Sequence, residues 1–395
     1  MSFLTRGVGS IIKSAIIPAL APQKARLAGP AVLPKSVLET AQRELLNFAN
    51  TGSSVLEISH RSKEFEQVNQ EAQQNLKDLL DVPDDYAILF MQGGASAQFS
   101  SIYLNLLVNQ SKPVDYIVTG IWSEKALKEA KKLGGNCNVV FNLNNSKDKK
   151  LPIDDKDWNF SKDSSYIFYV SNETVHGIEL NDHEDKFFEK FPKDKVLVCD
   201  MSSNILSRKV DVKKFGCIFF GVQKNIGPAG LTVVVIKKEL IGTRQDKNVP
   251  VPSMLCYKTC YDANSMYNTP PTFSVYLSNL VFKNLKELGG ISYMEKLNLE
   301  KSNLIYGIID KRKDVFQCPV EVSLRSRMNI VWRCLGSDGK PSNIVEKEFF
   351  DGAERLRLHQ LQGHRVVGGV RASLYNAIPM ESVLCLADYM NNFKP

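Results

Sequence analysis

The sequence lacks the features by which disulfide-rich, zinc-binding and membrane-spanning proteins are identified. Its eight cysteines include no Cys-x-x-Cys pair, and several, such as Cys199 and Cys217, lie inside apolar runs where cysteine behaves as a small hydrophobe. No apolar run reaches the roughly 20 residues that a transmembrane helix needs. We therefore expect a reducing compartment, no metal site and no membrane partner.

Charge of one sign is not concentrated anywhere in the chain. The formal net charge of +7 is modest for 395 residues, and the densest basic stretch, 147–150, is interrupted by Asp148. Nothing approaches the block of about five or six like charges that is typical of nucleic-acid-binding tails. We expect no nucleic-acid partner, and the small positive charge fits an enzyme of anionic substrates as well as weak polyanion binding.

Acidic residues are absent from positions 1–38, which carry five basic residues. This composition resembles a mitochondrial presequence, although serines are few, and an ordered or dangling arm is the alternative. We treat residues 1–24 as an N-terminal extension. The expected location is cytoplasmic, with a mitochondrial one as the alternative.

The length of the chain predicts a large domain with a smaller one, and 43% hydrophobic and 24% charged residues are typical of a soluble globular protein. Strands alternate with helices as far as about residue 240, which predicts an α/β domain over 25–285, and a small α+β domain follows over 286–395. The predicted segments are helices at 37–49, 65–79, 275–288, 293–309, 345–359 and 380–393, and strands at 86–91, 114–120, 137–143, 166–170, 196–200, 217–220, 231–236, 327–332 and 370–375.

One lysine lies between two apolar strands. Lys224 follows the run 217–220 and precedes the run 231–236, in a segment of glycines and a proline where no helix can continue. The simplest interpretation is a solvated loop lysine. Desolvation between apolar flanks would instead favour the uncharged amine, which attacks carbonyl groups, so Lys224 is a candidate Schiff-base residue.

A carboxylate ends a neighbouring apolar strand. Asp200 closes the run 196–200, where an ionised group is costly unless it is paired. Pyridoxal phosphate requires this combination, because a lysine holds its aldehyde as an imine and an acid keeps its ring nitrogen protonated. The turn at Gly93 and Gly94, between a strand and a helix, would suit the phosphate, although a simple tight turn is the alternative.

Other residues fit an anion-binding cleft but also have ordinary explanations. Trp122 follows a strand, where open α/β sheets bind ligands, yet core packing is the commoner role of tryptophan. Ser123 is the expected N-cap of the next helix. The candidate anion contacts are His60 and Arg61 before a helix, and His364, Arg365 and Arg371 in the small domain.

Nine segments together resemble the phosphoserine aminotransferase family, and they follow one another in order over residues 28–395. They are AGPA at 28–31, SHRS at 59–62, QGG at 92–94, TGIWS at 119–123, NETVHG at 172–177, DMSS at 200–203, QKNIGPAG at 223–230, YNTPPTF at 267–273 and GHRVVGGVRAS at 363–373.

The resemblance implies a fold-type I pyridoxal-phosphate-dependent aminotransferase with a large mixed-sheet α/β domain and a smaller α+β C-terminal domain. It also implies a homodimer with both active sites at the subunit interface. The reaction of the family converts 3-phosphohydroxypyruvate and glutamate into O-phospho-L-serine and 2-oxoglutarate, a step of L-serine biosynthesis. The cofactor is pyridoxal 5′-phosphate.

The resemblance also implies a role for each matching position. Lys224 matches the Schiff-base lysine, Asp200 the pyridinium partner, Trp122 the residue stacked on the ring and Thr174 the residue bonded to the 3-oxygen of the ring. Contacts to the cofactor phosphate match the backbone amides of Ala95 and Ser96, together with Gln223, and with Asn268 and Thr269 of the other subunit. Substrate contacts match Arg371 for the α-carboxylate, and His60, Arg61, His364 and Arg365 for the phosphate or the distal carboxylate of glutamate.

The chain departs from the family pattern near its start. Residues 25–27, Ala-Arg-Leu, stand where family members have an Asn-Phe pair, and residues 1–24 exceed the usual family start. Another aminotransferase or a lyase of the same fold is an alternative, such as a serine–glyoxylate enzyme or a cysteine desulfurase using Cys256 or Cys260. A non-catalytic dimeric scaffold is a further alternative, against which the intact catalytic positions count.

Overall fold

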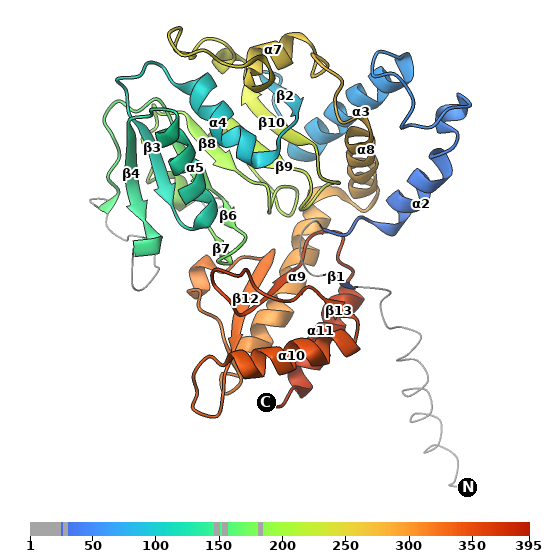
Figure 1. Ribbon diagram of the computed structural model, residues 1–395, viewed down its shortest axis with the longest axis vertical. Coiled ribbons are helices and arrows are strands. Elements are labelled where there is room, and N and C mark those ends of the chain that lie inside the picture. The colour runs from blue at the N-terminus through green and yellow to red at the C-terminus, as the bar shows by residue number, and fades with distance from the viewer. Residues whose placement is uncertain (1–24, 27–30, 146–150, 152–156, 181–184) are drawn as a thin grey trace.

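The computed structural model describes residues 25–26, 31–145, 151, 157–180 and 185–395, and these form two lobes (Figure 1). The larger lobe contains a seven-stranded sheet with helices on both faces, and the smaller lobe contains a three-stranded sheet with helices packed on it. The expected N-terminal extension and residues 28–30 of the AGPA segment lie outside the described residues.

The large sheet has the strand order β2-β10-β9-β8-β5-β3-β4, and all its strands except β10 run parallel. The parallel pattern therefore ends at β10, slightly before the predicted change at residue 240. The strands are buried on both faces, which is why they are continuous apolar runs in the sequence. Their bounds are β2 (Tyr86–Met91), β3 (Val114–Val118), β4 (Cys137–Asn142), β5 (Ile167–Val170), β8 (Leu197–Asp200), β9 (Cys217–Gly221) and β10 (Thr232–Lys237).

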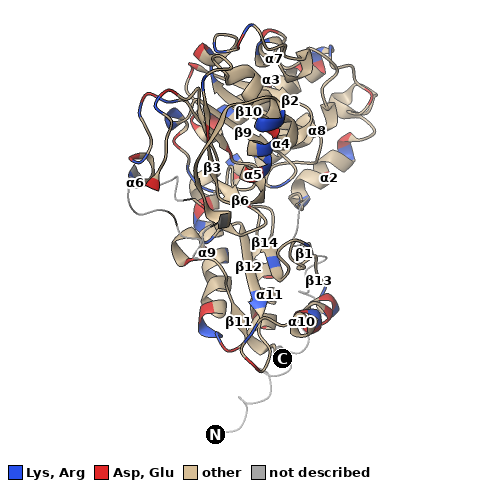
Figure 2. Ribbon diagram, turned by 60° about the vertical axis from the view of Figure 1, so that its left-hand side comes forward, with Lys and Arg blue, Asp and Glu red and all other residues tan. Residues whose placement is uncertain are grey.

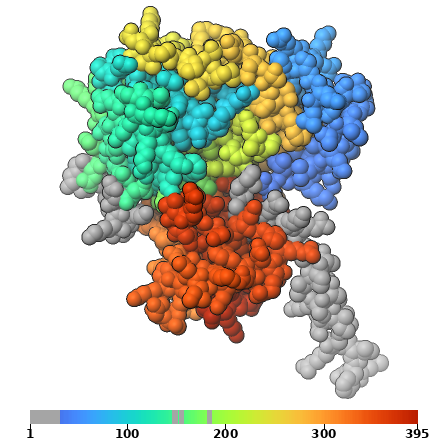
Figure 3. Space-filling view, viewed as in Figure 1, coloured from blue at the N-terminus to red at the C-terminus, as the bar shows by residue number. Residues whose placement is uncertain are grey.

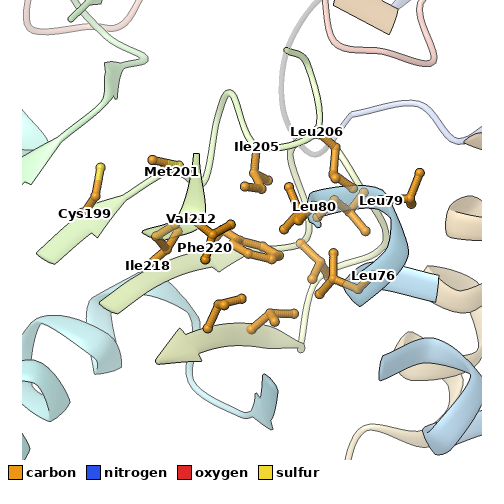
Figure 4. Packing of buried hydrophobic residues seen from close by; sticks show 14 of the residues in the cluster. Leu76, Leu79, Leu80, Cys199, Met201, Ile205, Leu206, Val212, Ile218 and Phe220 are labelled. Atoms are coloured by element: carbon orange, nitrogen blue, oxygen red, sulfur yellow. The ribbon is translucent and has the colours of Figure 1, made fainter. Parts of the chain in front are cut away.

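Helices cover both faces of this sheet. One face is packed by α4 (Gly94–Leu106), α5 (Ile121–Lys132) and α7 (Tyr257–Asp262). The other is packed by α2 (Lys35–Glu44), α3 (Lys63–Leu80), α6 (Asp185–Phe188) and α8 (Thr272–Glu287). On this second face, Leu76 and Leu80 of α3 lie against Phe220 of β9 (Figure 4). Burying each such side chain stabilises the fold by about 1.5–3 kcal/mol, so the strand ends that follow are rigidly placed.

The small lobe has its own apolar core and lies beneath the large lobe in the space-filling view (Figure 3). Its antiparallel sheet consists of β11 (Phe316–Gln317), β12 (Asn329–Cys334) and β14 (Val370–Ser373), packed by α9 (Gly290–Lys311), α10 (Asn343–Arg355) and α11 (Met380–Asn392). Helix α9 joins the lobes, because Ile291 belongs to the core of the large lobe and Ile305 to that of the small one. The domain boundary between 285 and 286 stays a prediction.

Short elements complete the described structure. A hairpin of β6 (Asn172–Glu173) and β7 (Ile178–Glu179) follows β5, and β1 (Ala25–Arg26) pairs in parallel with β13 (Leu358–His359) of the small lobe. The 3-10 turns are Phe48–Asn50, Leu143–Asn145, Val212–Lys214, Lys238–Leu240, Ser253–Leu255 and Val322–Leu324. None of the described helices is both long enough and apolar enough to cross a membrane.

Several predicted helix ends were wrong. The helix predicted at 37–49 ends at Glu44, and Ala49 has a φ of 48°, which a right-handed helix does not allow. The helix predicted at 345–359 ends at Arg355, because Arg357 has a φ of 61° and the chain then enters β13. Helices α8 and α9 each begin about one turn earlier than predicted.

The sequence predicted Ser123 as the N-cap of α5, and this prediction was wrong. Gly120 occupies that position, and Ser123 lies in the first turn. Its hydroxyl accepts hydrogen bonds from the backbone N–H groups of Thr119 (2.9 Å) and Gly120 (3.1 Å). Ser123 therefore still accepts hydrogen bonds from backbone N–H groups at the start of the helix, but from a position within its first turn.

Candidate active site

The carboxyl ends of parallel strands meet at one edge of the large sheet, which faces the small lobe (Figure 1). Polar or glycine segments follow β2, β3, β5, β8 and β9 at this edge and bring Gly93, Gly120, Thr174, Asp200 and Lys224 together. Open α/β sheets bind their ligands at such an edge. We therefore place the candidate active site here.

Lys224 is held at the centre of this edge. Its ammonium donates a hydrogen bond of 2.8 Å to Thr174 Oγ1, and its Nζ lies 5.1 Å from the ring centroid of Trp122. The structure thus brings together three of the predicted cofactor contacts, which come from the segments after β9, β5 and β3.

The turn that carries Lys224 is tightly packed. Its backbone is closed by a hydrogen bond of 2.7 Å from Gly227 N to Val222 O, and Val222 N donates to Leu231 O at 3.2 Å. A side chain at Gly227 would place its Cβ 2.5 Å from Ser278 Oγ on α8, so any larger residue would require Ser278 or the turn to move. The lysine is therefore positioned by the fold, and the solvated-loop interpretation does not hold.

Asp200 is buried, and its neighbours fix its orientation. Its Oδ1 accepts hydrogen bonds from Ser202 N (2.8 Å) and Ser202 Oγ (2.6 Å), and the same hydroxyl accepts from Gly221 N (3.0 Å). The ends of β8 and β9 are thereby joined through one serine. The hydrogen bonds that the Asp200 carboxylate accepts from described residues both go to Oδ1, which leaves Oδ2 for a ligand.

Burial shifts both central groups toward their uncharged forms. It lowers the pKa of Lys224, which the charge of Arg371 lowers further, whereas Asp200 and Glu173 act to raise it. Burial also raises the pKa of Asp200, against the opposing effects of Lys224 and of the Ser202 hydrogen bonds. An amine whose neutral form is favoured next to a carboxylate is suited to nucleophilic and proton-transfer work.

Glu173, to which we assigned no role from the sequence, organises the first turn of α5. Its Oε1 accepts from Ser123 N (2.8 Å) and Ser123 Oγ (2.7 Å), and its Oε2 accepts from Trp122 N (3.0 Å). A Cβ at Gly120 would lie 2.6 Å from the Glu173 carboxyl carbon, so glycine permits the contact. The buried carboxylate thus sets where Trp122 stands. A carboxylate near the end of a buried strand was the signal in the sequence, as it was for Asp200.

The start of α4 forms an open cradle after β2. Its N-cap, Gly93, has a φ of 95°, and no side chain caps the first turn, which includes Ala95 and Ser96. Uncapped N–H groups at a helix N-terminus favour an anion, because they add to the positive end of the helix dipole. The predicted phosphate contact Gln223 is half-buried and folds against Gly221, where an added Cβ would lie 2.6 Å from its amide oxygen.

Asn268 and Thr269 lie beside this cradle in the same chain. Gln92 Nε2 donates to Thr269 O (2.9 Å), and Asn268 Nδ2 donates to Gln92 Oε1 (3.4 Å). Both residues are exposed in the single chain. Their predicted contact with the site of another subunit stays a prediction.

Cationic groups face the site from the small lobe. Arg371 lies on β14, half-buried, and its Nε has no hydrogen-bond partner within the part of the chain that the structure describes. Burial lowers the pKa of His364, and the charges of Arg371, Arg365 and Lys125 lower it further. The charges of Arg371, Arg365 and Lys125 therefore all act on His364, and Lys125 is a residue that we did not single out from the sequence.

His60 and Arg61 are not brought to this site in the single chain. They lie in the loop before α3, and their side chains form no hydrogen bond or ion pair with another described residue. Their predicted role as substrate contacts stays a prediction.

Comparison with known proteins gives one consistent result. A model of the family "Aminotransferase class-V" matches residues 26–386. The chain is 45% identical over 368 residues to a phosphoserine aminotransferase of Laribacter hongkongensis, covering 93% of this chain and 97% of that protein. It is 45% identical over 369 residues to the chloroplastic phosphoserine aminotransferase 2 of Arabidopsis thaliana, covering 93% and 83%.

Solved structures agree with these relatives. Phosphoserine aminotransferase from Bacillus circulans subsp. alkalophilus superposes with a TM-score of 0.84 at 40% identity, covering 92% of this chain and 96% of that one. The phosphoserine aminotransferase of Trichomonas vaginalis with bound pyridoxal phosphate superposes with a TM-score of 0.85 at 38% identity, covering 94% and 100%.

The fold is that of a pyridoxal-phosphate-dependent aminotransferase of class V. Within this class, the chain belongs to the phosphoserine aminotransferase family.

Proposed function

We propose that this site transfers an amino group between glutamate and 3-phosphohydroxypyruvate and yields 2-oxoglutarate and O-phospho-L-serine, a step of L-serine biosynthesis. The observation that carries the proposal is the pairing of a half-buried Lys224 with a buried Asp200 at one sheet edge, opposite a group of cations on the small lobe. The 45% identity to phosphoserine aminotransferases over 93% of the chain supports it.

The cofactor is pyridoxal 5′-phosphate, and the residues of the site fit it. Buried Asp200 has one carboxylate oxygen open for a ring nitrogen, and the uncapped start of α4 suits a phosphate. Trp122 Nε1 is buried without a hydrogen-bond partner in the described part of the chain. We assign the ring to Asp200, Trp122 and Thr174. The assigned phosphate contacts are Ala95, Ser96 and Gln223, together with Asn268 and Thr269 of a partner.

The chemistry divides between cofactor and protein. When bound, pyridoxal phosphate supplies a ring that accepts the electron pair left when the substrate α-proton is removed. Burial disfavours the charged form of Lys224 Nζ, so this amine would hold the aldehyde of the bound cofactor and, once released, would take up the substrate α-proton and return it. Thr174 Oγ1 orients the amine, and Asp200 holds a proton on the ring nitrogen, a task that requires a fixed, buried carboxylate.

Substrate recognition falls to the cations of the small lobe. We assign the α-carboxylate to Arg371, whose Nε is otherwise unpaired among the described residues, because a guanidinium matches a carboxylate with two parallel hydrogen bonds. His364 and Arg365 receive the phosphate or the distal carboxylate of glutamate. A substrate without its second anionic group would leave these cations unpaired, which penalises it.

The proposed function is tested by the absorbance of the cofactor in the purified protein. We expect a yellow enzyme whose band bleaches when glutamate is added and returns when 3-phosphohydroxypyruvate follows. Phosphoserine and 2-oxoglutarate should accumulate in equal amounts. A protein that binds pyridoxal phosphate but leaves its band unchanged with both substrates would contradict the proposal.

A homodimer is part of the proposal. The side chains of His60 and Arg61 form no hydrogen bond or ion pair with another described residue, and Asn268 and Thr269 are exposed. Two leucines near the loop before α3 are also exposed, Leu46 by 83% and Leu56 by 56%. A second copy covering this surface would bury them and bring the polar residues to the neighbouring site.

Subunit mixing tests the shared site. Lys224→Ala and Asn268→Ala/Thr269→Ala subunits should each form poorly active homodimers. If the loop serves the partner, a mixed dimer has one intact site, and random exchange should restore up to about a quarter of wild-type activity. No recovery in verified mixed dimers would show that each chain serves its own site.

The alternatives to this function gain no support. A cysteine desulfurase would need a reactive cysteine, but Cys260 is buried on α7 and burial raises its pKa to about 11. A scaffold without catalysis would not need an arginine whose Nε lacks a partner among the described residues, close to a lysine whose pKa burial lowers. The cytoplasmic location stays a prediction, with the mitochondrial one as its alternative, because residues 1–24 lie outside the described structure.

A further inference from the structure

Helix α5 carries a lysine that the proposed roles do not use. Lys125 lies three residues after Trp122, so both side chains occupy the same face of the helix at the site. The Lys125 ammonium lies 4.4 Å from the ring centroid of Trp122, the same ring that Lys224 approaches to 5.1 Å. The exposed side chain is thus directed toward the cofactor side of the helix.

Lys125 has no acidic partner among the described residues, unlike Lys128 and Lys132 of the same helix. Lys128 pairs with Glu124 at 2.6 Å, and Lys132 lies 4.0 Å from Glu129. Lys125 forms no ion pair with any described residue. A lysine that faces a ring and lacks a carboxylate is available to an anion, because the contact between a solvent-exposed ammonium and a ring is weak.

The small lobe brings further positive charge to the same space. His364 is close enough to Lys125 for the lysine to lower its pKa, and Arg365 and Arg371 act in the same direction. Basic residues lie along α5 in the view of Figure 2. Cations of both lobes thus lie close enough to influence one another, and Lys125 has no acidic partner among the described residues. A doubly charged anion bound among them would reduce their mutual repulsion.

We propose that Lys125 binds the phosphate group of the phosphorylated keto acid and amino acid, from the large lobe, and thereby determines the preference for phosphorylated substrates. The inference rests on the proposed function. Arg371 is assigned to the α-carboxylate at one end of the substrate, and Lys125 completes the group around the other end. The ammonium leaves the Trp122 ring for the phosphate, since a charge-assisted hydrogen bond is stronger than a solvent-exposed contact with a ring.

Lys125→Met tests the inference, with Lys128→Met as the matched control. Both variants remove one exposed ammonium from α5, but Lys128 already pairs with Glu124. For Lys125→Met we expect kcat/KM for 3-phosphohydroxypyruvate to fall about ten- to hundredfold, almost entirely through KM. The value for hydroxypyruvate, which lacks the phosphate, should stay within about twofold. Lys128→Met should match wild type with both substrates.

Inhibition by inorganic phosphate provides a readout that does not depend on the second half of the reaction. The inhibition constant of phosphate should rise in Lys125→Met and stay unchanged in Lys128→Met, while Lys125→Arg should recover most of the wild-type value. Equal losses with both keto acids, or an altered cofactor absorbance, would show that Lys125 acts on Trp122 instead and would overturn the inference. A wild-type enzyme that does not use 3-phosphohydroxypyruvate would instead refute the proposed function itself.

Discussion

Among the described residues, two lysines have a pKa that burial lowers, and they have different surroundings. Burial lowers the pKa of both Lys224 and Lys301, the latter to about 8. Lys224 shares its space with the carboxylates of Asp200 and Glu173, whereas Lys301 meets only oxygens of neutral groups. Burial alone therefore does not identify a reactive lysine. A carboxylate and an open position next to the amine do.

The surroundings of Lys301 indicate a structural role. Its Nζ donates to Asn376 O (3.2 Å) and Tyr375 O (3.4 Å) from α9, and Asn376 N donates in turn to Asn225 Oδ1 (2.8 Å). Asn225 follows Lys224 directly in the sequence. Lys301 thus holds residues 375–376 of the small lobe, which in turn contact the turn that carries Lys224. The two lysines are linked through these hydrogen bonds, but one is reactive and the other is structural.

The comparison is tested most strongly by removing each amine. Lys224→Ala should lower kcat by on the order of 10⁵-fold, because the nucleophile and the proton carrier are lost together. Lys301→Met should keep kcat within about threefold of wild type once the protein is folded. Steady-state rates with glutamate and 3-phosphohydroxypyruvate measure both. Similar losses in the two variants would break the distinction between a reactive and a structural lysine.

The next largest effect should come from Asp200, because Lys224 has a carboxylate beside it and Lys301 has none among the described residues. Asp200→Asn keeps an oxygen for the two Ser202 hydrogen bonds but removes the charge that would hold a proton on the cofactor ring. We expect kcat to fall on the order of 10²–10³-fold, as for other losses of fixed electrostatic stabilisation. Single-turnover rates with glutamate measure the step directly. Ser202→Ala, which keeps the charge, should lose less, and an equal loss would contradict the electrostatic role.

The sequence predicted much of this site because its strands are buried on both faces. Continuous apolar runs located the ends at which Lys224 and Asp200 stand, and the comparisons confirmed the family that the motifs suggested. Helix ends were less predictable. The positive φ values of Ala49 and Arg357 stop helices where the apolar periodicity continues, and nothing in these residue types announces such a backbone.

Residues whose roles depend on strand order could not be predicted in the same way. Glu173 reaches α5 because β5 lies next to β3 in the sheet, and this neighbourhood is not visible in the order of the chain. Lys125 has no role until the small lobe places His364 opposite α5. For Glu173, the sequence did show a carboxylate near the end of an apolar strand, but its contact with α5 could be inferred only once the strand order was known.

The second acid near Lys224 is Glu173, and its replacement tests whether this acid also supports the cofactor site. Glu173→Gln removes a charge and leaves an amide donor facing a backbone donor, either Trp122 N–H or Ser123 N–H. We expect the dissociation constant of pyridoxal phosphate to rise about tenfold, since hydrogen bonds to charged groups contribute about 1.5–3 kcal/mol. Glu124→Gln, on the solvent side of the same turn, is the control. Unchanged affinity in Glu173→Gln would mean that Trp122 is positioned without it.

The smallest effect should be a change in how stability depends on pH, and it isolates Lys301. Burial lowers its pKa to about 8, so between pH 8 and its ordinary value near 10.5 the unfolded chain holds a proton that the folded chain has released. The free energy of unfolding therefore gains up to about 1.4 kcal/mol per pH unit from this group in that range. Below pH 8 both states hold the proton and the gain is absent.

Denaturant unfolding at several pH values should show this increment in wild type and in the exposed-lysine control Lys296→Met, but not in Lys301→Met. If the free energy of unfolding changed with pH in the same way in all three proteins, Lys301 would titrate as an ordinary surface lysine. Burial would then not lower its pKa as it lowers that of Lys224.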